Sequence, residues 1–277
     1  MTIEITGSTV DGSKEQKILD DTENILGFQV VAVNRDMCLD AIVEIIKSRS
    51  DSHNTDQNIR TYYLACINPH SIYMASKDPI VKQALLNADI LVPDGIGIIL
   101  ASRLRGGRIR GRITGSDIFE GVSERLNECG GFSYFFLGST HRVLEKIREK
   151  MSKKYPRIRV AGVYSPPFSD VVDQSESNRI VDTVNQVSPD VLWVGMTAPK
   201  QEKWIFENRY RLRVKFIGAI GAVFDFFSGE VKRPGAFFQR LGLEWLGRFM
   251  RQPRRLWRRT VISAPWFLMQ LLKYTVK

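Results

Sequence analysis

The sequence predicts an α/β fold in which a mainly parallel, Rossmann-like sheet has helices on both faces. Short apolar runs, typical of buried strands, alternate with longer runs of helical, amphipathic periodicity. Strands separated by helices favour a parallel sheet that is covered on both sides. The end of the chain is strongly basic and rich in aromatic residues, which adds a basic helical C-terminal appendage. With 277 residues, 43% of them hydrophobic, the chain can bury one large core beside this appendage.

The expected elements follow one another regularly from residue 28 onward. Residues 28–33 predict a strand and residues 36–47 a helix, and a polar loop occupies residues 48–58. The later strands are expected at residues 61–67, 90–92, 132–137, 158–163, 191–195 and 215–220. The later helices are expected at residues 71–76, 79–86, 98–104, 117–127, 141–154, 175–187 and 200–209.

Charge divides the chain into three parts. Residues 1–27 carry six acidic and two basic side chains with weak periodicity, and we expect a poorly ordered acidic lead-in. Residues 28–230 form the expected α/β domain. The appendage spans residues 231–277 and contains eleven Lys or Arg residues but one acid, Glu244. Because the net charge of the whole chain is +10, the part before the appendage is close to neutral, and the appendage is suited to an anionic partner.

The basic appendage has three interpretations. Trp245, Leu246 and Phe249 fall near one helical stripe with arginines around it, Pro253 divides the run, and Pro265 begins a further helix. We expect this surface to bind an anionic membrane, because Trp and Leu on one face suit lipid better than a phosphate backbone. The alternatives are nucleic-acid binding through the same arginines, and packing of the apolar stripe on the domain.

Composition also bounds the compartment and the cofactors. No stretch is long and apolar enough to span a bilayer, and the N-terminus lacks a signal pattern. Cys38, Cys66 and Cys129 are too widely spaced for a zinc site and fit a reducing cytoplasm. No Asp-x-Asp pair is present to hold a metal–nucleotide complex, so we expect neither a metal nor a cofactor.

The stretch from Ile90 to Gly97 has the pattern of a strand, a tight turn and a helix. Asp94 stands where the expected strand ends, before two glycines. In open α/β sheets, ligands bind at the carboxyl ends of the strands, and an ionised Asp there can accept a proton from a substrate hydroxyl. The ordinary alternative is that Asp94 caps the helix, since Asp is a common N-cap residue.

Two further turns between a strand and a helix suit a nucleotide. Gly138 and Gly195 each follow an apolar run, and such turns offer unhindered backbone N–H groups to phosphate. After Gly195, Lys200 can neutralise phosphate, and Gln201 can recognise a base or a sugar with one donor and one acceptor group. Neither turn has the Rossmann or P-loop spacing, so both are also compatible with ordinary connections.

Several motifs then occur in one particular order along the chain. They are Asn68-Pro69, Pro93-Asp94-Gly95, Arg112 to Asp117, Phe136-Leu137-Gly138, Pro199-Lys200-Gln201-Glu202, Gly221 to Phe226, and Gly242 to Leu246 with Arg248. In this combination, over about residues 28–259, the chain resembles the WecG/TagA/CpsF glycosyltransferases, glycosyltransferase family 26.

The resemblance implies an inverting, metal-independent transfer of a hexose-type sugar from a UDP-sugar to a polyprenyl-diphosphate-linked glycan. Such an enzyme would be cytoplasmic and peripheral on the inner face of the bacterial plasma membrane, in surface or exopolysaccharide synthesis. Three questions stay open: which sugar is donated, which glycan accepts it, and whether the protein forms a homo-oligomer. The alternative function is a basic α/β protein that binds nucleotides or nucleic acid without transfer chemistry.

The resemblance also implies roles for individual residues. Asp94 would be the general base. Arg248 would reach the leaving diphosphate or the lipid diphosphate, and Arg112 would help to hold a diphosphate, a surface ion pair being the alternative for either arginine. Gln201 would contact the nucleotide sugar.

One departure from the family pattern lies in the expected site. Cys66 and Asn68 stand where the family usually has Thr-x-Asn, a stretch expected to contact the sugar. A thiol is a poor hydrogen-bond donor, and we interpret this exchange as a shift in donor or acceptor.

Overall fold

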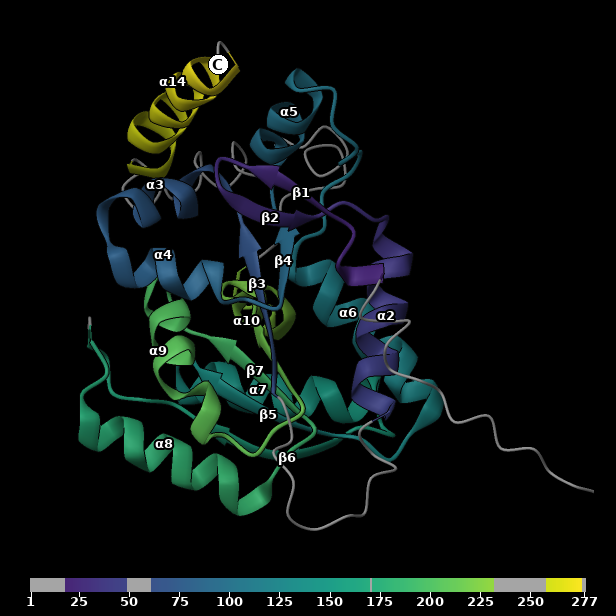
Figure 1. Ribbon diagram of the computed structural model, residues 1–277. Coiled ribbons are helices and arrows are strands. Elements are labelled where there is room, and N and C mark those ends of the chain that lie inside the picture. Colours follow the sequence, from purple (N-terminus) through teal and green to yellow (C-terminus); the bar gives the residue numbers. More distant parts are fainter. Residues whose placement is uncertain (1–17, 49–60, 170, 232–257, 276–277) are drawn as a thin grey trace, which may run out of the picture.

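The computed structural model describes residues 18–48, 61–169, 171–231 and 258–275. These residues form a six-stranded sheet flanked by helices and a separate two-stranded hairpin (Figure 1). The predicted α/β, Rossmann-like fold is therefore confirmed, and a C-terminal helix is present.

The elements lie close to their expected positions. The strands of the main sheet are β3 (Tyr62–Ile67), β4 (Ile90–Pro93), β5 (Ser133–Gly138), β6 (Arg159–Tyr164), β7 (Val191–Gly195) and β8 (Phe216–Ala219). The helices up to residue 154 are α2 (Arg35–Ser48), α3 (Pro69–Lys77), α4 (Pro79–Leu86), α5 (Ile96–Leu104), α6 (Gly115–Cys129) and α7 (His141–Lys154). The later helices are α8 (Gln174–Val187), α9 (Lys200–Asn208), η1 (Arg209–Arg211), α10 (Val223–Ser228), η2 (Arg258–Ser263) and α14 (Ala264–Thr275).

All neighbouring strands of the main sheet are parallel, in the order β4-β3-β8-β7-β5-β6. The chain runs from β3 outward to β4, crosses to β5 and runs outward to β6, and then fills the centre with β7 and β8. Since the strands are parallel, the turns after β4, β5, β7 and β8 share one edge of the sheet. In such folds ligands bind at this edge, close to the point where the strand order reverses.

The first expected strand does not belong to this sheet. Strands β1 (Thr22–Ile25) and β2 (Phe28–Val31) form an antiparallel hairpin. The two residues between them, Leu26 and Gly27, have φ angles of +50° and +91°, as a two-residue hairpin turn of type I′ requires. The Asn24 side chain accepts a hydrogen bond from the Gly27 N–H at 3.0 Å.

This hairpin corrects the expected lead-in, because residues 22–27 are part of the folded structure. Ile25 is buried in the apolar core, and the Glu23 carboxylate accepts hydrogen bonds from the Ser102 hydroxyl at 2.8 Å and the Arg108 N–H at 2.9 Å. The acidic side chain that suggested a solvated lead-in thus attaches the hairpin to the region around α5. Residues 1–17 lie outside the described residues.

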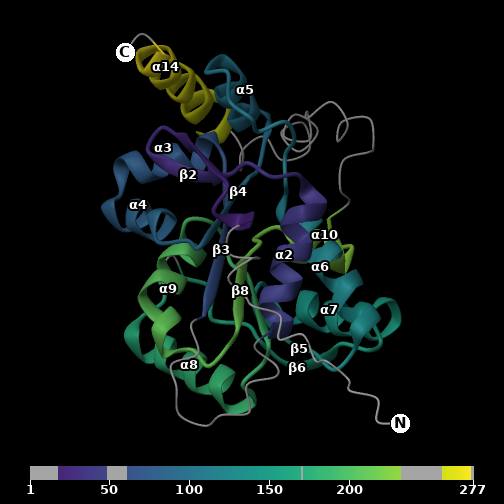
Figure 2. The ribbon, with the colours of Figure 1, turned by 45° about the vertical axis from the view of Figure 1, so that its right-hand side comes forward.

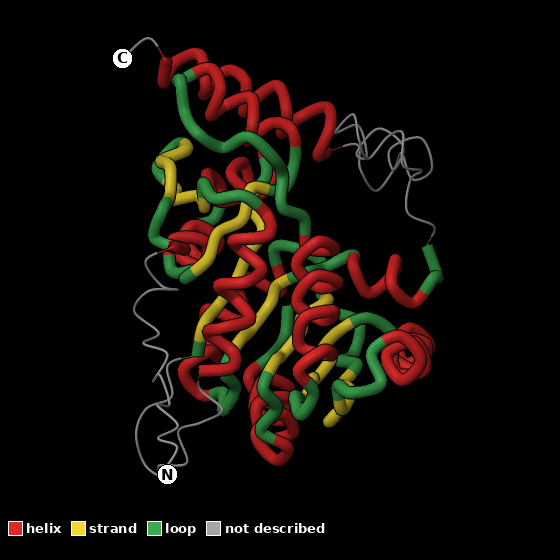
Figure 3. Tube along the Cα trace, turned by 90° about the vertical axis from the view of Figure 1, so that its right-hand side faces the viewer, coloured by secondary structure: helices red, strands yellow, loops and turns green. Residues whose placement is uncertain are grey.

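The sheet is covered on both faces, and its strands are buried throughout much of their length (Figure 3). Helices α2, α6, α7 and α10 contribute to the core on one face. Helices α3, α4, α5, α8 and α9 contribute to the core on the other face, as does α14. Along β3, Leu64 belongs to the first core and Tyr63 and Ala65 to the second, which is the alternation expected of a strand buried on both sides.

Helix α14 packs on the domain next to α3 and α5 (Figure 2). Phe267 and Leu271, one helical turn apart, are buried in the core that α3 and α5 share. Just before this helix, the Ser263 hydroxyl lies 2.8 Å from His70 Nδ1 at the start of α3. One face of this helix therefore packs on the domain, as one interpretation of the appendage predicted. Within the part of the chain that is described, no helix has the length and apolar character needed to cross a membrane.

Candidate active site

Asp94 lies at the carboxyl end of β4, in the turn that leads into α5. Its backbone N–H donates to the Ile67 carbonyl of the neighbouring strand at 2.8 Å, which holds the turn against the end of β3. The N-cap of α5 is Gly95, and no side chain caps this helix. The interpretation of Asp94 as a helix cap is therefore wrong. Asp94 is half-buried at the edge of the sheet where a substrate hydroxyl can approach.

Cys66 and Asn68 lie on the adjacent strand and the turn after it. Cys66 is half-buried and pairs in register with Val92, two residues before Asp94. Burial, and then the negative charge of Asp94, raise the pKa of the Cys66 thiol well above its usual range. The thiol therefore stays protonated at neutral pH, and it is not activated as a nucleophile.

Asn68 has a structural role in addition to its expected one. Its side-chain oxygen caps α3 by accepting hydrogen bonds from the N–H groups of His70 and Ser71, each at 3.0 Å. The Ser71 hydroxyl in turn accepts a hydrogen bond from the Asn68 N–H at 2.8 Å, which completes a capping box. The cap holds the turn after β3 in place beside the Asp94 turn.

The segment that contains Arg112 runs next to the same turn. The Ile113 N–H donates to the Pro93 carbonyl at 2.8 Å, so Arg112 lies close in the backbone to Asp94 and is half-buried. The chain then enters α6 through a capping box between Thr114 and Asp117, in which the Asp117 carboxylate accepts from the Thr114 N–H at 2.9 Å. The structure thus brings Cys66, Asn68, Arg112 and Asp94 together, although they come from separate parts of the sequence.

Gly138 and Gly195 end two neighbouring strands and lie side by side. They are paired in register at the ends of β5 and β7. Gly138 has a φ angle of +115°, and a Cβ atom there would lie 2.7 Å from the backbone carbon and oxygen of Gly195. Both turns need glycine for packing, so close strand contact accounts for Gly138 independently of any ligand.

Replacement of Gly138 by alanine should destabilise the fold. Strain at a positive φ angle costs about 1–3 kcal/mol, and contact with the backbone of Gly195 adds to this loss. Urea unfolding measures the change. The control is Gly106→Ala, because Gly106 also has a positive φ angle, +68°, but a Cβ there would meet no atom within 4 Å. Equal losses in the two variants would show that the contact with Gly195 has no effect.

Gln201 is buried in the first turn of α9, with 4% of its surface exposed. Its Nε2 donates to the Glu202 carboxylate at 2.9 Å, whereas its Oε1 has no hydrogen-bond partner among the described residues. A Cβ at Gly221 would lie 3.5 Å from this oxygen, so the amide faces the turn after β8. A buried acceptor without a partner is costly, and a ligand N–H or O–H could satisfy it.

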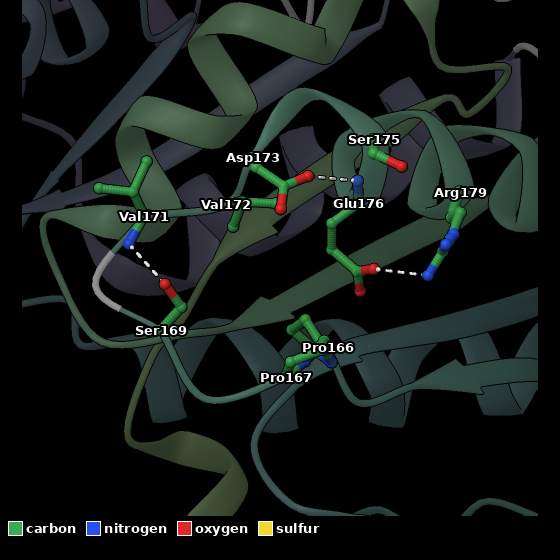
Figure 4. Close-up of a pocket in the computed structure, with 9 residues that line it drawn as sticks. All are labelled: Pro166, Pro167, Ser169, Val171, Val172, Asp173, Ser175, Glu176 and Arg179. Atoms are coloured by element: carbon green, nitrogen blue, oxygen red, sulfur yellow. Dashed lines mark hydrogen bonds and ion pairs between the residues drawn. The ribbon is translucent and has the colours of Figure 1, made fainter.

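A hollow of about 230 Å³ lies in the segment between β6 and α8 (Figure 4). Its carboxylates have partners within the protein: Asp173 caps α8, and Glu176 accepts from the Tyr164 hydroxyl at 3.0 Å. Strand β6 is at the opposite edge of the sheet from β4, so this hollow is remote from Asp94. Lys200, expected to neutralise phosphate, donates to the Ser169 carbonyl here at 2.7 Å.

The remaining expectations concern metal binding and Arg248. Within the described ranges, no group of three or more His, Cys, Asp or Glu side chains is arranged to hold a metal ion. Metal independence stays a prediction. Arg248 lies outside the described residues, as does the motif from Gly242 to Leu246.

Sequence reasoning missed two parts of this region. Glu202 is buried and bonded to Gln201, a contact that the sequence motif does not indicate. Helix α14 reaches the first turn of α5, three residues after Asp94, since a Cβ at Gly97 would lie 3.6 Å from the Phe267 ring. The docking of α14 had a signal in the sequence: apolar residues are spread around this helix, which indicates that more than one of its faces is covered.

Comparison with known proteins identifies the family of this chain. Residues 23–277 match the model of the glycosyl transferase WecG/TagA/CpsF family. A protein of Bacillus spizizenii (strain W23) named N-acetylglucosaminyldiphosphoundecaprenol N-acetyl-beta-D-mannosaminyltransferase is 31% identical over 89% of this chain and 92% of its own length. Proteins of the same name from Bacillus subtilis (strain 168) and Staphylococcus aureus (strain MW2) are 31% and 25% identical, over 80% and 79% of this chain and 83% and 82% of their own lengths.

The family match extends over most of the chain and includes every predicted site residue. The half-buried carboxylate at the end of β4 and the buried amide at the start of α9 lie within it. The chain belongs to the WecG/TagA/CpsF family of glycosyltransferases.

Proposed function

We propose that this enzyme transfers a hexose-type sugar from a UDP-sugar to a glycan linked to a polyprenyl diphosphate, with inversion at the anomeric carbon. The observation that carries the proposal is Asp94, a carboxylate at the carboxyl edge of the sheet that is not used as a helix cap. The relatives' names describe transfer of N-acetylmannosamine to a diphosphoundecaprenol-linked sugar. N-Acetylmannosamine is therefore the first donor sugar to test.

The reaction would be a single displacement. The acceptor hydroxyl oxygen attacks the anomeric carbon while its proton passes to the Asp94 carboxylate, and the bond from the anomeric carbon to the diphosphate oxygen breaks to release UDP. Arg112, near the Asp94 turn, is suited to hold a diphosphate through its forked donors. Arg248 is proposed to offset the charge that develops on the leaving diphosphate.

The spacing of the turns supports a nucleotide sugar as donor. Three strand intervals separate β4 from β7, a distance of about 14 Å at the usual spacing of strands. An extended nucleotide sugar can lie along such an edge, with its nucleotide near Gly138, Gly195 and Gln201 and its sugar near Asp94. The unpartnered Gln201 oxygen would accept a hydrogen bond from the donor. Cys66 and Asn68 would adjoin the sugar.

A lipid-linked acceptor requires catalysis at a membrane surface. We propose a peripheral enzyme on the inner face of the bacterial plasma membrane, held there by its basic appendage. The alternative, a protein that binds nucleotides or nucleic acid without transfer, shares the basic charge but requires neither a lipid-linked acceptor nor Asp94.

A panel of UDP-sugars incubated with a lipid-linked acceptor tests the proposal. Release of UDP that depends on both the donor and the acceptor would support it. If the protein binds UDP and DNA but releases no UDP from any of the donors, the alternative of a nucleotide- or nucleic-acid-binding protein is favoured. The donor that gives the fastest release identifies the sugar.

Transfer should persist in an excess of EDTA. Without a metal, protein cations and backbone N–H groups would neutralise the leaving diphosphate. UDP release measured with and without the chelator, after dialysis, tests this expectation. Loss of turnover that magnesium or manganese restores would contradict it.

A further inference from the structure

A cluster of exposed apolar side chains lies at one end of the molecule. Of the fifteen large hydrophobic residues that are exposed in the described ranges, eight belong to α5 or to η2 and α14. These elements lie side by side (Figures 1 and 2). We define the α5–α14 face by Leu100 and Leu104 on α5 and by Leu268, Met269 and Leu272 on α14. Exposed apolar side chains gathered in this way mark an interaction surface.

Helix α14 is apolar on both of its sides. Phe267 and Leu271 point into the core, whereas Leu268, Met269 and Leu272 are between 51% and 67% exposed. A helix that is hydrophobic all round is normally covered on every side. Among the described residues, the domain covers one side of α14, and the apolar side chains of the outer side are exposed.

Helix α5 contributes to the same surface through its own outer residues. Leu100 and Leu104, one turn apart, are 42% and 59% exposed. The two helices are joined where they end, because the Arg105 guanidinium lies 4.1 Å from the centre of the Tyr274 ring. The Tyr274 hydroxyl also donates to the Asn24 side chain of the hairpin at 3.1 Å. The contacts hold α5, α14 and the hairpin together.

The two chain segments that form this face are basic. Residues 96–112 contain five arginines and no acid, and residues 258–277 contain four basic residues and no acid. Arg103, Arg105 and Arg110 are exposed. Arg108 is the exception, since it is paired with Asp21 at 2.5 Å. Apolar side chains on segments that also carry exposed cations are complementary to a bilayer with anionic headgroups.

We propose that the α5–α14 face enters an anionic lipid bilayer, so that the helix directly after Asp94 is itself a membrane-binding element. Leu100, Leu104 and Leu272 would enter the boundary between headgroups and acyl chains. Arg103 and Arg110 would contact lipid phosphates. The membrane contact is thus shared between the C-terminal appendage and the catalytic domain.

This arrangement sets the distance between the site and the lipid, a consequence that rests on the proposed function. Helix α5 has nine residues, and at 1.5 Å per residue Asp94 is about 14 Å from the far end of the helix. A sugar attached to a lipid diphosphate at the bilayer surface would then approach Asp94 while its polyprenyl chain stays in the membrane.

Vesicle flotation with the full-length protein tests the proposal. Wild-type protein should float with vesicles of phosphatidylglycerol and phosphatidylcholine, and Leu100→Ser/Leu104→Ser should bind about tenfold more weakly because two apolar anchors are lost. The control is Ile80→Ser/Leu86→Ser on α4, where both side chains are 44% exposed, and its binding should be unchanged. Circular dichroism melting verifies that each variant is folded.

The charge contribution is tested separately. Arg103→Gln/Arg110→Gln should weaken binding to phosphatidylglycerol vesicles by about fivefold per arginine, and the loss should shrink as salt rises. Wild-type binding by a folded Leu100→Ser/Leu104→Ser variant would overturn the proposal. Analytical sedimentation tests a different role for the face. If Leu100→Ser/Leu104→Ser converts a dimer to a monomer and leaves vesicle binding unchanged, the face joins two copies of the chain and the proposal is wrong. Flotation needs no donor sugar, so failure of the membrane proposal can be distinguished from failure of the proposed sugar transfer.

Discussion

Asp94→Asn should lower the rate of sugar transfer by about two to four orders of magnitude, the usual contribution of a positioned general base. The asparagine amide has nearly the same shape as the carboxylate but cannot accept the proton of the acceptor hydroxyl. The hydrogen bond from the Asp94 N–H to the Ile67 carbonyl should persist in this variant, because it is made by the backbone. Side-chain capping is not lost either, since Gly95 is the N-cap of α5.

The matched control is Asp78→Asn, the same chemical change at a carboxylate that does cap a helix. Asp78 accepts hydrogen bonds from the N–H groups of Ile80 and Val81 at the start of α4, and asparagine caps helices about equally well. This variant should transfer sugar at a nearly normal rate. UDP release and thermal unfolding, measured on both variants, separate catalysis from folding. Normal turnover by a folded Asp94→Asn variant would remove Asp94 from the mechanism and leave the base to be found elsewhere.

Arg209→Met should have the largest effect on stability, a loss of about 3–5 kcal/mol, because it breaks a buried ion pair by removing one partner. Arg209 and Asp89 form an ion pair at 3.2 Å, and both side chains are 5% exposed. Arg209 also donates to the Asn87 carbonyl at 2.6 Å. Asp89 in turn accepts from the Tyr63 N–H at 2.9 Å, so the pair connects η1 with the starts of β3 and β4. Domains are typically stable by about 5–15 kcal/mol, so this loss is a large share.

The free energies of unfolding of Arg209→Met and Arg211→Met, measured in urea, test this prediction. Arg211 lies in the same short helix but is exposed. It donates to the buried Asn208 and the exposed Asn178 and forms no ion pair with a carboxylate among the described residues, so its replacement should cost less, about 1 kcal/mol. Adding Asp89→Asn to Arg209→Met should restore part of the stability, because the second buried charge of the pair is then removed as well. Similar losses from the two arginine variants would mean that the buried pair contributes no more than the hydrogen bonds of an exposed arginine.

The accuracy of the sequence predictions depended on how local each feature is. Helix α7 and strand β7 have the predicted bounds, since periodicity and the flanking glycine specify them within a few residues. The β1–β2 hairpin was missed because its signal is a single Leu26-Gly27 turn in an acidic stretch. The cap interpretation of Asp94 failed for a related reason. Composition favours Asp as an N-cap, but the bond between Asp94 and the Ile67 carbonyl places the cap one residue later.

The sequence by itself determined the alternation of strands and helices and the position of Asp94 after a buried strand, because both follow from neighbouring residues. Only the tertiary structure decided the strand order, which pairs Gly138 with Gly195 and brings Cys66 next to the Asp94 turn. It also decided that Phe267 docks against the first turn of α5, so that helix α14 lies near the site. These features depend on contacts between residues far apart in the chain, and local pattern carries no information about them.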